Sequence, residues 1–272
     1  MRNLAVSVGA IALGALLAGC QREPAAVSDN SAANVAAPAQ ATNAAEPVSA
    51  KPFQVEEKGE FLEFSYGWPA QAAAIPALDQ WLRSNMAHHR TRMTALGREA
   101  AEDARKNGWP ERRYDYVQTW EVAADTPALL VLYAQGYEYT GGAHGMPFPA
   151  TLIWDKAKGV RLATNALIDP AALAKATKAR FCKALDAQRA EKRGEAVNPN
   201  EPIPEFGRCV ALEAQEIVPV STGGKAIDLI RIEIMPYEAG PYAEGIYTVD
   251  LPVDTAVRGA VKPAWKAAFG PA

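Results

Sequence analysis

The chain has 272 residues, a formal net charge of −3 and a hydrophobic fraction of 49%. It lacks the basic excess that nucleic-acid-binding domains use against phosphates, so the composition argues against a nucleic-acid partner. Its 3 histidines are too few for a histidine-rich zinc site, and we expect neither a metal nor a cofactor.

The first twenty residues have the pattern of a bacterial lipoprotein signal. Arg2 precedes an apolar run from Leu4 to Ala18 that is too short to cross a bilayer. The run ends in Leu17-Ala18-Gly19-Cys20, which matches a lipobox. We therefore expect a signal peptide over residues 1–19 and a lipid on Cys20, with an ordinary signal peptide and a chance cysteine as the alternative.

Residues 20–52 are expected to form a flexible tether. They are mostly Ala, Pro, Ser, Asn and Gln, and such a segment buries too little apolar surface to offset its ordering entropy. A coil of this length reaches roughly 30 Å from the membrane. Gln21 follows the cysteine in place of the aspartate associated with inner-membrane retention. We expect the domain to face the periplasm from a lipid-anchored position, with the outer membrane favoured.

The first half of the domain predicts strands around one long helix. Residues 53–66 show interrupted alternation, which indicates two short strands or one bent one. Residues 75–107 predict a helix that ends at Gly108 and Pro110. Its apolar stripe recurs at three- and four-residue spacing and consists of Leu78, Leu82, Met86, His89, Met93 and Leu96.

Further strands are predicted along the chain. Residues 114–123 and 128–139 read as an antiparallel hairpin. A third strand over 148–154 follows the glycine-rich stretch 140–145 and ends in a turn at 156–159.

A second long helix begins at Asp169, an expected N-cap, with Pro170 at its first position. It runs to about Lys192 and carries Leu173, Phe181 and Leu185 on one side. Residues 210–220, 226–235 and 247–253 are expected strands, before a short C-terminal helix. The pattern predicts an α+β fold: an antiparallel β-sheet with two long helices, arranged as one core or as two sub-lobes.

Two cysteines remain beside Cys20. In an oxidising periplasm, Cys182 and Cys209 are most simply a disulfide. The bond would close a proline-rich loop and contribute about 3.5 kcal/mol on the chain-entropy model. A metal site or a nucleophilic thiol is the alternative, but no C-x-x-C motif is present.

Catalytic patterns are scarce in this sequence. The H-E-x-x-H, G-x-S-x-G and S-x-x-K motifs are absent. His88 and His89 are adjacent, so on a helix they cannot face one metal, and His89 is expected to be a core residue with one hydrogen bond. We assign no catalytic residue and expect a protein that is not an enzyme, although dispersed triads leave the question open.

Two loops contain the candidate binding residues. Thr140-Gly-Gly-Ala-His-Gly145 has three glycines, which indicate positive φ values or close backbone approach. Pro236 to Gly245 contains Pro-Tyr-x-x-Gly twice, which sets two tyrosines at a fixed spacing, as in binding hot spots. Each loop has a structural alternative, a β-bulge for the first and a double turn with buried tyrosines for the second. The proposed ligand-binding residues are Gly141, Gly142, His144, Tyr237, Glu238, Pro241 and Tyr242.

Three segments together resemble a module of bacterial envelope proteins. They are the stretch Tyr137–Gly145, a strand ending in Ile153-Trp154-Asp155, and the stretch Pro236–Ile246. The module is similar to the extracellular part of lysozyme-sensing anti-sigma factors and to the non-catalytic N-terminal module of some peptidoglycan deacetylases, a group largely described as domains of unknown function. The resemblance covers residues 53–266.

The resemblance implies an α+β domain in two sub-domains, residues 53–166 and 167–272. For the sensor branch it also implies binding of lysozyme-type proteins. We expect this protein to differ from those relatives in three ways: a lipid anchor in place of a transmembrane helix, no cytoplasmic sigma-binding segment and no appended deacetylase domain. Only a binding role is therefore carried over.

Three hypotheses follow. The first is an envelope lipoprotein whose two loops bind a lysozyme-like protein or cell-wall glycan, and it expects exposed Tyr237 and Tyr242. The second is a peptidoglycan-related hydrolase with His144 beside a carboxylate. The third is a purely structural lipoprotein whose tyrosines are buried.

Overall fold

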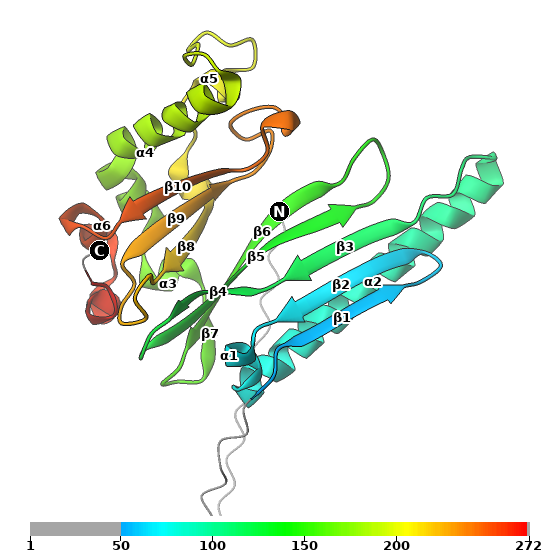
Figure 1. The fold of residues 1–272 in the computed structure, drawn as a ribbon, viewed down its shortest axis with the longest axis horizontal. Helices are drawn as coiled ribbons and strands as arrows, with labels where there is room; N and C mark the ends of the chain where they lie inside the picture. The colour runs from blue at the N-terminus through cyan, green and yellow to red at the C-terminus, as the bar shows by residue number, and fades with distance from the viewer. Residues whose placement is uncertain (1–49, 271–272) are drawn as a thin grey trace, which may run out of the picture. The chain divides into compact units, whose positions relative to one another are not determined.

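The computed structural model describes residues 50–270 (Figure 1). The expected signal peptide, the lipidated Cys20 and all but the last residues of the expected tether lie outside the described residues. Nineteen elements follow one another within these described residues in α+β fashion, with two long helices among short ones. The fold class expected from the sequence is confirmed.

Seven strands form the larger sheet, in the order β1-β2-β3-β5-β6-β7, with β4 pairing the first half of β5. All pairings are antiparallel except β2 with β3, which is parallel. The strands are β1 (Phe53–Lys58), β2 (Leu62–Trp68), β3 (Tyr114–Thr119), β4 (Glu121–Asp125), β5 (Leu129–Tyr139), β6 (Met146–Asp155) and β7 (Val160–Leu162).

Helix α2 (Pro76–Asn107) covers one face of this sheet, after the short helix α1 (Ala70–Ala73). It ends as predicted, with Gly108 in the left-handed conformation at φ 69°. Between helix and sheet lies a core of large side chains that includes Tyr66, Trp68, Leu82 and Met93. This packing leaves the other face of the sheet available to the second half of the chain.

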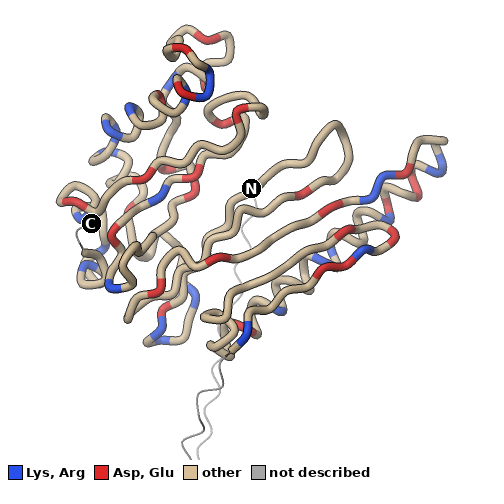
Figure 2. Tube along the Cα trace, viewed as in Figure 1, with Lys and Arg blue, Asp and Glu red and all other residues tan. Residues whose placement is uncertain are grey.

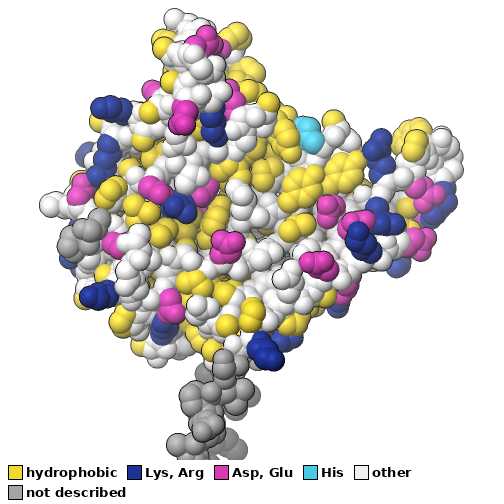
Figure 3. Space-filling view, in the orientation of Figure 1, with side chains coloured by type: hydrophobic (Ala, Val, Ile, Leu, Met, Phe, Trp, Pro, Cys, Tyr) yellow, Lys and Arg dark blue, Asp and Glu magenta, His cyan; other side chains and the backbone are white. Residues whose placement is uncertain are grey.

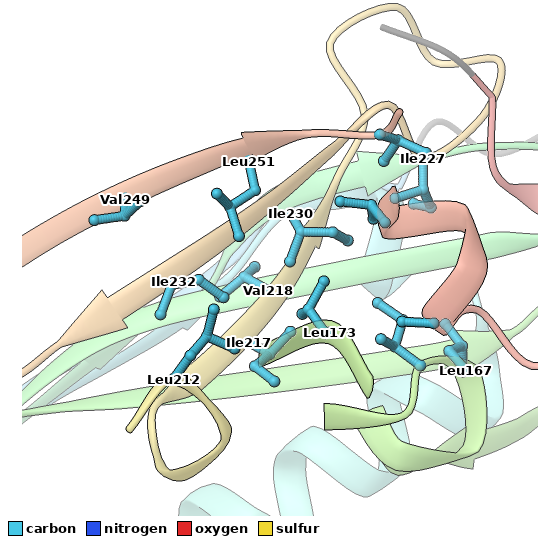
Figure 4. Close-up of a cluster of buried hydrophobic side chains, with 14 of the residues drawn as sticks. Leu167, Leu173, Leu212, Ile217, Val218, Ile227, Ile230, Ile232, Val249 and Leu251 are labelled. Carbon is cyan, nitrogen blue, oxygen red and sulfur yellow. The ribbon is translucent and has the colours of Figure 1, made fainter. Parts of the chain in front are cut away.

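The second half builds a smaller sheet with its own helix. Strands β10, β9 and β8 pair in that order, all antiparallel. They pack with the second long helix around a cluster of buried aliphatic side chains (Figure 4). The elements are α3 (Thr164–Leu167), α4 (Pro170–Arg193), α5 (Pro204–Gly207), η1 (Leu212–Ala214), β8 (Glu216–Val220), β9 (Leu229–Ile234), η2 (Tyr242–Glu244), β10 (Tyr247–Pro252), α6 (Thr255–Ala260) and η3 (Pro263–Ala268).

The two sheets share one hydrophobic core. Val131 of β5 and Ile153 of β6 belong to the same buried cluster as Val218 of β8 and Ile232 of β9. The backbone N–H of Ser221 also donates to the carbonyl of Ala123, 3.0 Å away, which joins the end of β8 to β4. The sub-domain boundary at residue 167 stays a prediction.

Several local expectations are confirmed. Asp169 caps α4 by accepting from the N–H of Ala172, and Leu173, Phe181 and Leu185 are buried on one side of that helix. Cys182 and Cys209 form a disulfide with Cα atoms 5.3 Å apart.

Other expectations are wrong in instructive ways. The strand predicted over residues 114–123 breaks at Trp120, because its N–H bonds to Gly67 of β2 and its indole to the Tyr66 hydroxyl. Leu96 is exposed, because α2 buries small residues there: a Cβ on Gly97 would lie 2.5 Å from the carbonyl oxygen of Phe61.

The strand expected over 210–220 also begins late, at Glu216. Its first residues follow disulfide-bonded Cys209 and form η1 instead, with Leu212 buried against α4. The short C-terminal helix is present as α6.

Candidate functional site

The β5–β6 hairpin connection, residues 140–145, is built around its glycines. Gly141 and Gly142 have φ values of 99° and 83°, which ordinary residues avoid. Gly145 is buried, and a Cβ on it would lie 2.5 Å from the Tyr137 ring. The Tyr137 hydroxyl accepts the Gly145 N–H at 3.2 Å. Both roles expected of the glycines, positive φ and close approach, are present.

The β9–β10 connection, residues 235–246, holds a tyrosine in an unusual backbone conformation. Tyr237 has a φ of 71°, the single positive φ of a non-glycine residue in the described part of the chain. Its N–H donates to Gly240 and that of Glu238 to Met235, so the turn is fixed by the backbone. A left-handed conformation costs a side-chain-bearing residue about 1–2 kcal/mol. The surrounding structure maintains this conformation while 49% of Tyr237 is exposed.

These two loops meet in what we call the aromatic cluster: His144, Tyr237 and Tyr242. The ring of His144 stacks on that of Tyr242 with centroids 3.8 Å apart, and the two tyrosine rings lie 5.9 Å apart. The Tyr242 hydroxyl donates to the Gly145 carbonyl at 2.9 Å. The contact joins a loop of the larger sheet to a loop of the smaller one.

Two hydrogen-bond partners orient the ring of His144. Nδ1 lies 3.0 Å from the Gly145 carbonyl oxygen, which can only accept, so Nδ1 carries the proton. Nε2 lies 3.3 Å from the Tyr237 hydroxyl, within hydrogen-bond distance. Both His144 and Tyr237 are exposed, whereas Tyr242 is half-buried.

The β9–β10 connection, residues 235–246, is from here on called the tyrosine loop. It is hydrogen-bonded to two arginines of α4, Arg189 and Arg193. Arg189 donates from Nε to the Ala239 carbonyl at 2.9 Å. Arg193 makes a two-pronged ion pair with Glu244, at 2.8 and 3.0 Å. Lysine and arginine positions recur along this helix (Figure 2).

Glu244 and Tyr247 titrate unusually because of this environment. Burial would raise the pKa of Glu244, but hydrogen bonds from Arg193 and Tyr247 outweigh it and hold the pKa below its ordinary value. Burial and the hydrogen bond to Glu244 raise the pKa of Tyr247 to about 12. Glu244 is therefore a carboxylate at neutral pH and a firm acceptor for the arginine.

The structure brings together most of the proposed site residues. Gly141, Gly142 and His144 lie on one loop, and Tyr237, Glu238, Pro241 and Tyr242 on the other, with Glu238 exposed and Pro241 half-buried. Sequence reasoning missed four residues that shape the site. These are Tyr137, Arg189, Arg193 and Glu244.

A shallow hollow of about 330 Å³ adjoins the hairpin loop. Glu138, His144 and Phe148 are among its lining residues. Hydrophobic and aromatic side chains gather on the molecular face that carries the β5–β6 hairpin (Figure 3). The hollow is too small to enclose a large ligand, and an exposed surface fits a partner that binds from outside.

The remaining histidines lie apart from this cluster. His89 stacks on Tyr116 with centroids 4.9 Å apart, but its buried Nδ1 has no hydrogen-bond partner among the described residues, contrary to the expected single bond. Burial lowers its pKa. Residues 50–270 contain no group of three potential metal ligands, and within that range we find no helix long and apolar enough to span a bilayer.

Comparisons with known proteins place part of the chain beside a named family. Residues 55–147 match the family model described as deacetylase PdaC. This segment runs from β1 to the start of β6 and includes the loop of His144, but not the tyrosine loop. No curated protein matches the chain.

Solved structures show the same fold over most of the chain. A DUF3298 family protein from Pseudomonas aeruginosa PAO1 has a TM-score of 0.51 at 15% identity and covers 82% of this chain and 97% of its own. A DUF3298 member from Bacteroides fragilis has a TM-score of 0.50 at 15% identity and covers 79% and 94%. At this identity the likeness concerns the fold alone.

These findings support the resemblance to the deacetylase-associated module, a domain family of unknown function. None of them concerns the lysozyme-sensing anti-sigma factors. That part of the resemblance stays a prediction.

Proposed function

We propose that this protein is a lipid-anchored recognition module of the bacterial cell envelope and binds its partner through the aromatic cluster. The observation that carries the proposal is the exposed Tyr237, kept in a strained backbone conformation beside His144 and Tyr242. Strained, solvent-facing residues are typical of binding sites, where the surrounding fold holds the conformation. Tyrosines on a fixed loop add contact area at small entropic cost.

The partner is a lysozyme-type protein or, as the second arm, a cell-wall glycan. The resemblance of the two loops to the sensor modules supports the first. Exposed tyrosines suit both, since they are frequent hot spots in protein interfaces and present flat apolar faces to sugars.

The aromatic cluster and the start of β1 lie toward opposite ends of the larger sheet. Phe53, where β1 begins, pairs with Trp68 at one end of the larger sheet. The strand registers put residues 140–145 toward the opposite end, roughly 20 Å further along β5 at about 3.4 Å per residue. The proposed site therefore lies toward the end of the larger sheet opposite to Phe53.

The other two hypotheses receive less support. The hydrolase hypothesis needs a carboxylate on His144, and the hydrogen-bond partners of that ring are the Tyr237 hydroxyl and a carbonyl. The purely structural hypothesis needs buried tyrosines, and Tyr237 is 49% exposed.

Calorimetry on the full mature chain tests the proposal. Wild type and Tyr237→Ala/Tyr242→Ala would be titrated with c-type lysozyme and, separately, with soluble peptidoglycan fragments. Trp109→Ala is the matched control, because Trp109 is an exposed aromatic residue outside the cluster.

We expect a dissociation constant in the micromolar range or tighter for one of the two probes. The double variant should weaken it at least about 30-fold, the effect of one hot-spot residue. If the double variant binds as tightly as wild type, the aromatic cluster is not part of the binding site. Absence of binding to both probes would contradict the proposal.

A further inference from the structure

Arg189 is a fully buried guanidinium between two segments far apart in the sequence. Its side chain is 0% exposed. Beyond its bond to Ala239 in the tyrosine loop, it donates to the carbonyls of Arg208 at 2.9 Å and Glu205 at 2.7 Å. Because a buried donor without a partner is costly, each of these carbonyls matters to the position of the guanidinium.

Arg193, one turn further along α4, makes the same bridge. It pairs with Glu244 on one side and donates to the Phe206 carbonyl at 3.0 Å on the other. Its side chain is 11% exposed and that of Glu244 14%. Two arginines thus connect residues 205–208 with the loop that carries Tyr237 and Tyr242.

The segment 205–208 has little structure of its own to hold it. It consists of the last three residues of helix α5 and the residue after it, and the connection from Gly194 to β8 contains no strand. The next residue, Cys209, is bonded to Cys182 of the same helix α4. The disulfide therefore fixes the segment whose carbonyls position both arginines.

We infer that the Cys182–Cys209 bond and the two arginines form a positioning relay that keeps the aromatic cluster assembled, so that reduction of the disulfide weakens partner binding. The binding consequence rests on the proposed function, whereas the effect on the loop does not. In the reduction, a dithiol gives two electrons and two protons to the bond. Cys182 and Cys209 each become a thiol, and the dithiol leaves as its own disulfide.

The physical reason is that the disulfide restricts the motion of the backbone carbonyls that accept hydrogen bonds from the two arginines. With the bond intact, the carbonyls of residues 205–208 stay beside the guanidinium groups at no further entropic cost. With the bond reduced, each contact must order a long loop first. The arginines then lose directed acceptors, and the tyrosine loop loses the side chains that hold it.

Hydrogen exchange on the full mature chain, followed by mass spectrometry, tests the relay without any partner. The samples are the oxidised protein, the same protein reduced by a dithiol, and the variants Arg193→Met and Glu244→Gln. Arg180→Met is the matched control, since Arg180 lies on the same helix but pairs with Asp254, away from the relay.

We expect amides of residues 236–245 to exchange at least about ten-fold faster in the reduced protein and in Arg193→Met, with Glu244→Gln intermediate. Strand β9 should change little, which shows that the fold persists, and Arg180→Met should match wild type. If residues 236–245 exchange at the wild-type rate in Arg193→Met, the inferred role of Arg193 in holding the loop is overturned. Unchanged exchange after reduction would overturn the role of the disulfide.

A lysozyme titration of the oxidised and reduced proteins completes the test. If the oxidised protein binds, reduction should weaken binding at least about ten-fold, and equal affinity would overturn the regulatory inference. If the oxidised protein does not bind lysozyme, that arm of the proposed function fails, and the exchange data still decide the relay.

Discussion

His144 and Tyr242 stack with their ring centroids 3.8 Å apart and an interplanar angle of 22°, although one follows β5 of the larger sheet and the other follows β9 of the smaller one. Such a pair contributes about 0.5–1.5 kcal/mol beyond burial. The stack therefore joins the two sheets at their loops, in addition to the core they share.

Gly145→Ala should disrupt the hairpin loop, because its Cβ would lie 2.5 Å from the Tyr137 ring and 2.7 Å from the Glu138 carbonyl oxygen. We expect a loss of about 1–3 kcal/mol in the free energy of unfolding, the usual cost of overpacking, measured by urea denaturation. Gly142→Ala is the control: it has positive φ but no atom within 4 Å of the added Cβ, so only the cost of about 1 kcal/mol for φ should appear. Equal losses would show that the close approach of Gly145 is unimportant.

Tyr237→Gly should keep or raise stability while removing binding. Glycine adopts the φ of 71° without strain, which can return up to about 1 kcal/mol, but it lacks the ring. Tyr237→Ala keeps the strain and should be the less stable of the two. If Tyr237→Gly were the less stable variant, the tyrosine would be chiefly a structural residue.

Glu244→Gln should destabilise the protein at neutral pH. The pKa of Glu244 is held below its ordinary value, after burial is outweighed by Arg193 and Tyr247. The carboxylate therefore stabilises the fold above that ordinary value, and the contribution is lost as pH falls through the lower folded pKa. The stability difference from wild type should shrink on acidification, as followed by denaturation from pH 7 to pH 3. A constant difference would contradict the ion-pair role.

Glu233→Gln should change the stability at neutral pH in the opposite direction and stabilise the protein. Burial raises the pKa of Glu233, and the hydrogen bond from Thr248 only partly offsets this. A raised folded pKa means that the charge opposes folding at pH 7, and that stability recovers as pH falls through the folded pKa towards the ordinary one. The glutamine variant should therefore be more stable than wild type at pH 7 and lose that advantage in acid. A loss of stability at pH 7 would show that the carboxylate is needed.

Cys182→Ala/Cys209→Ala should cost about 3.5 kcal/mol of unfolding free energy, given a sequence separation of 27 residues. Chemical denaturation of the double variant beside oxidised wild type measures the loss. Leu185→Ala is a reference for ordinary core damage in the same helix, because Leu185 is fully buried. A loss below about 1 kcal/mol would mean that the loop is held by its other contacts.

Local signals predicted the helices well. The N-cap at Asp169, the left-handed Gly108 and the glycines of the hairpin loop are short-range consequences of backbone chemistry, so the sequence shows them directly. The disulfide was also predictable, since only two cysteines remained to pair.

Contacts between distant segments could not be predicted in the same way. The parallel pairing of β2 with β3 and the meeting of His144 with the tyrosine loop depend on how the sheets assemble. One such contact had a signal in the sequence. The buried positions of α4 recur every four residues from Leu173 to Leu185, and Arg189 continues this spacing. An arginine that continues a buried stripe indicates a guanidinium with internal acceptors.

The most direct test of the central claim is a hydrogen-exchange footprint of the full mature chain with and without saturating c-type lysozyme. Protection of residues 140–145 and 236–245 together, with α2 unaffected, is the predicted result. Protection confined to other surfaces, with both loops exchanging as in the free protein, would contradict the aromatic cluster as the binding surface.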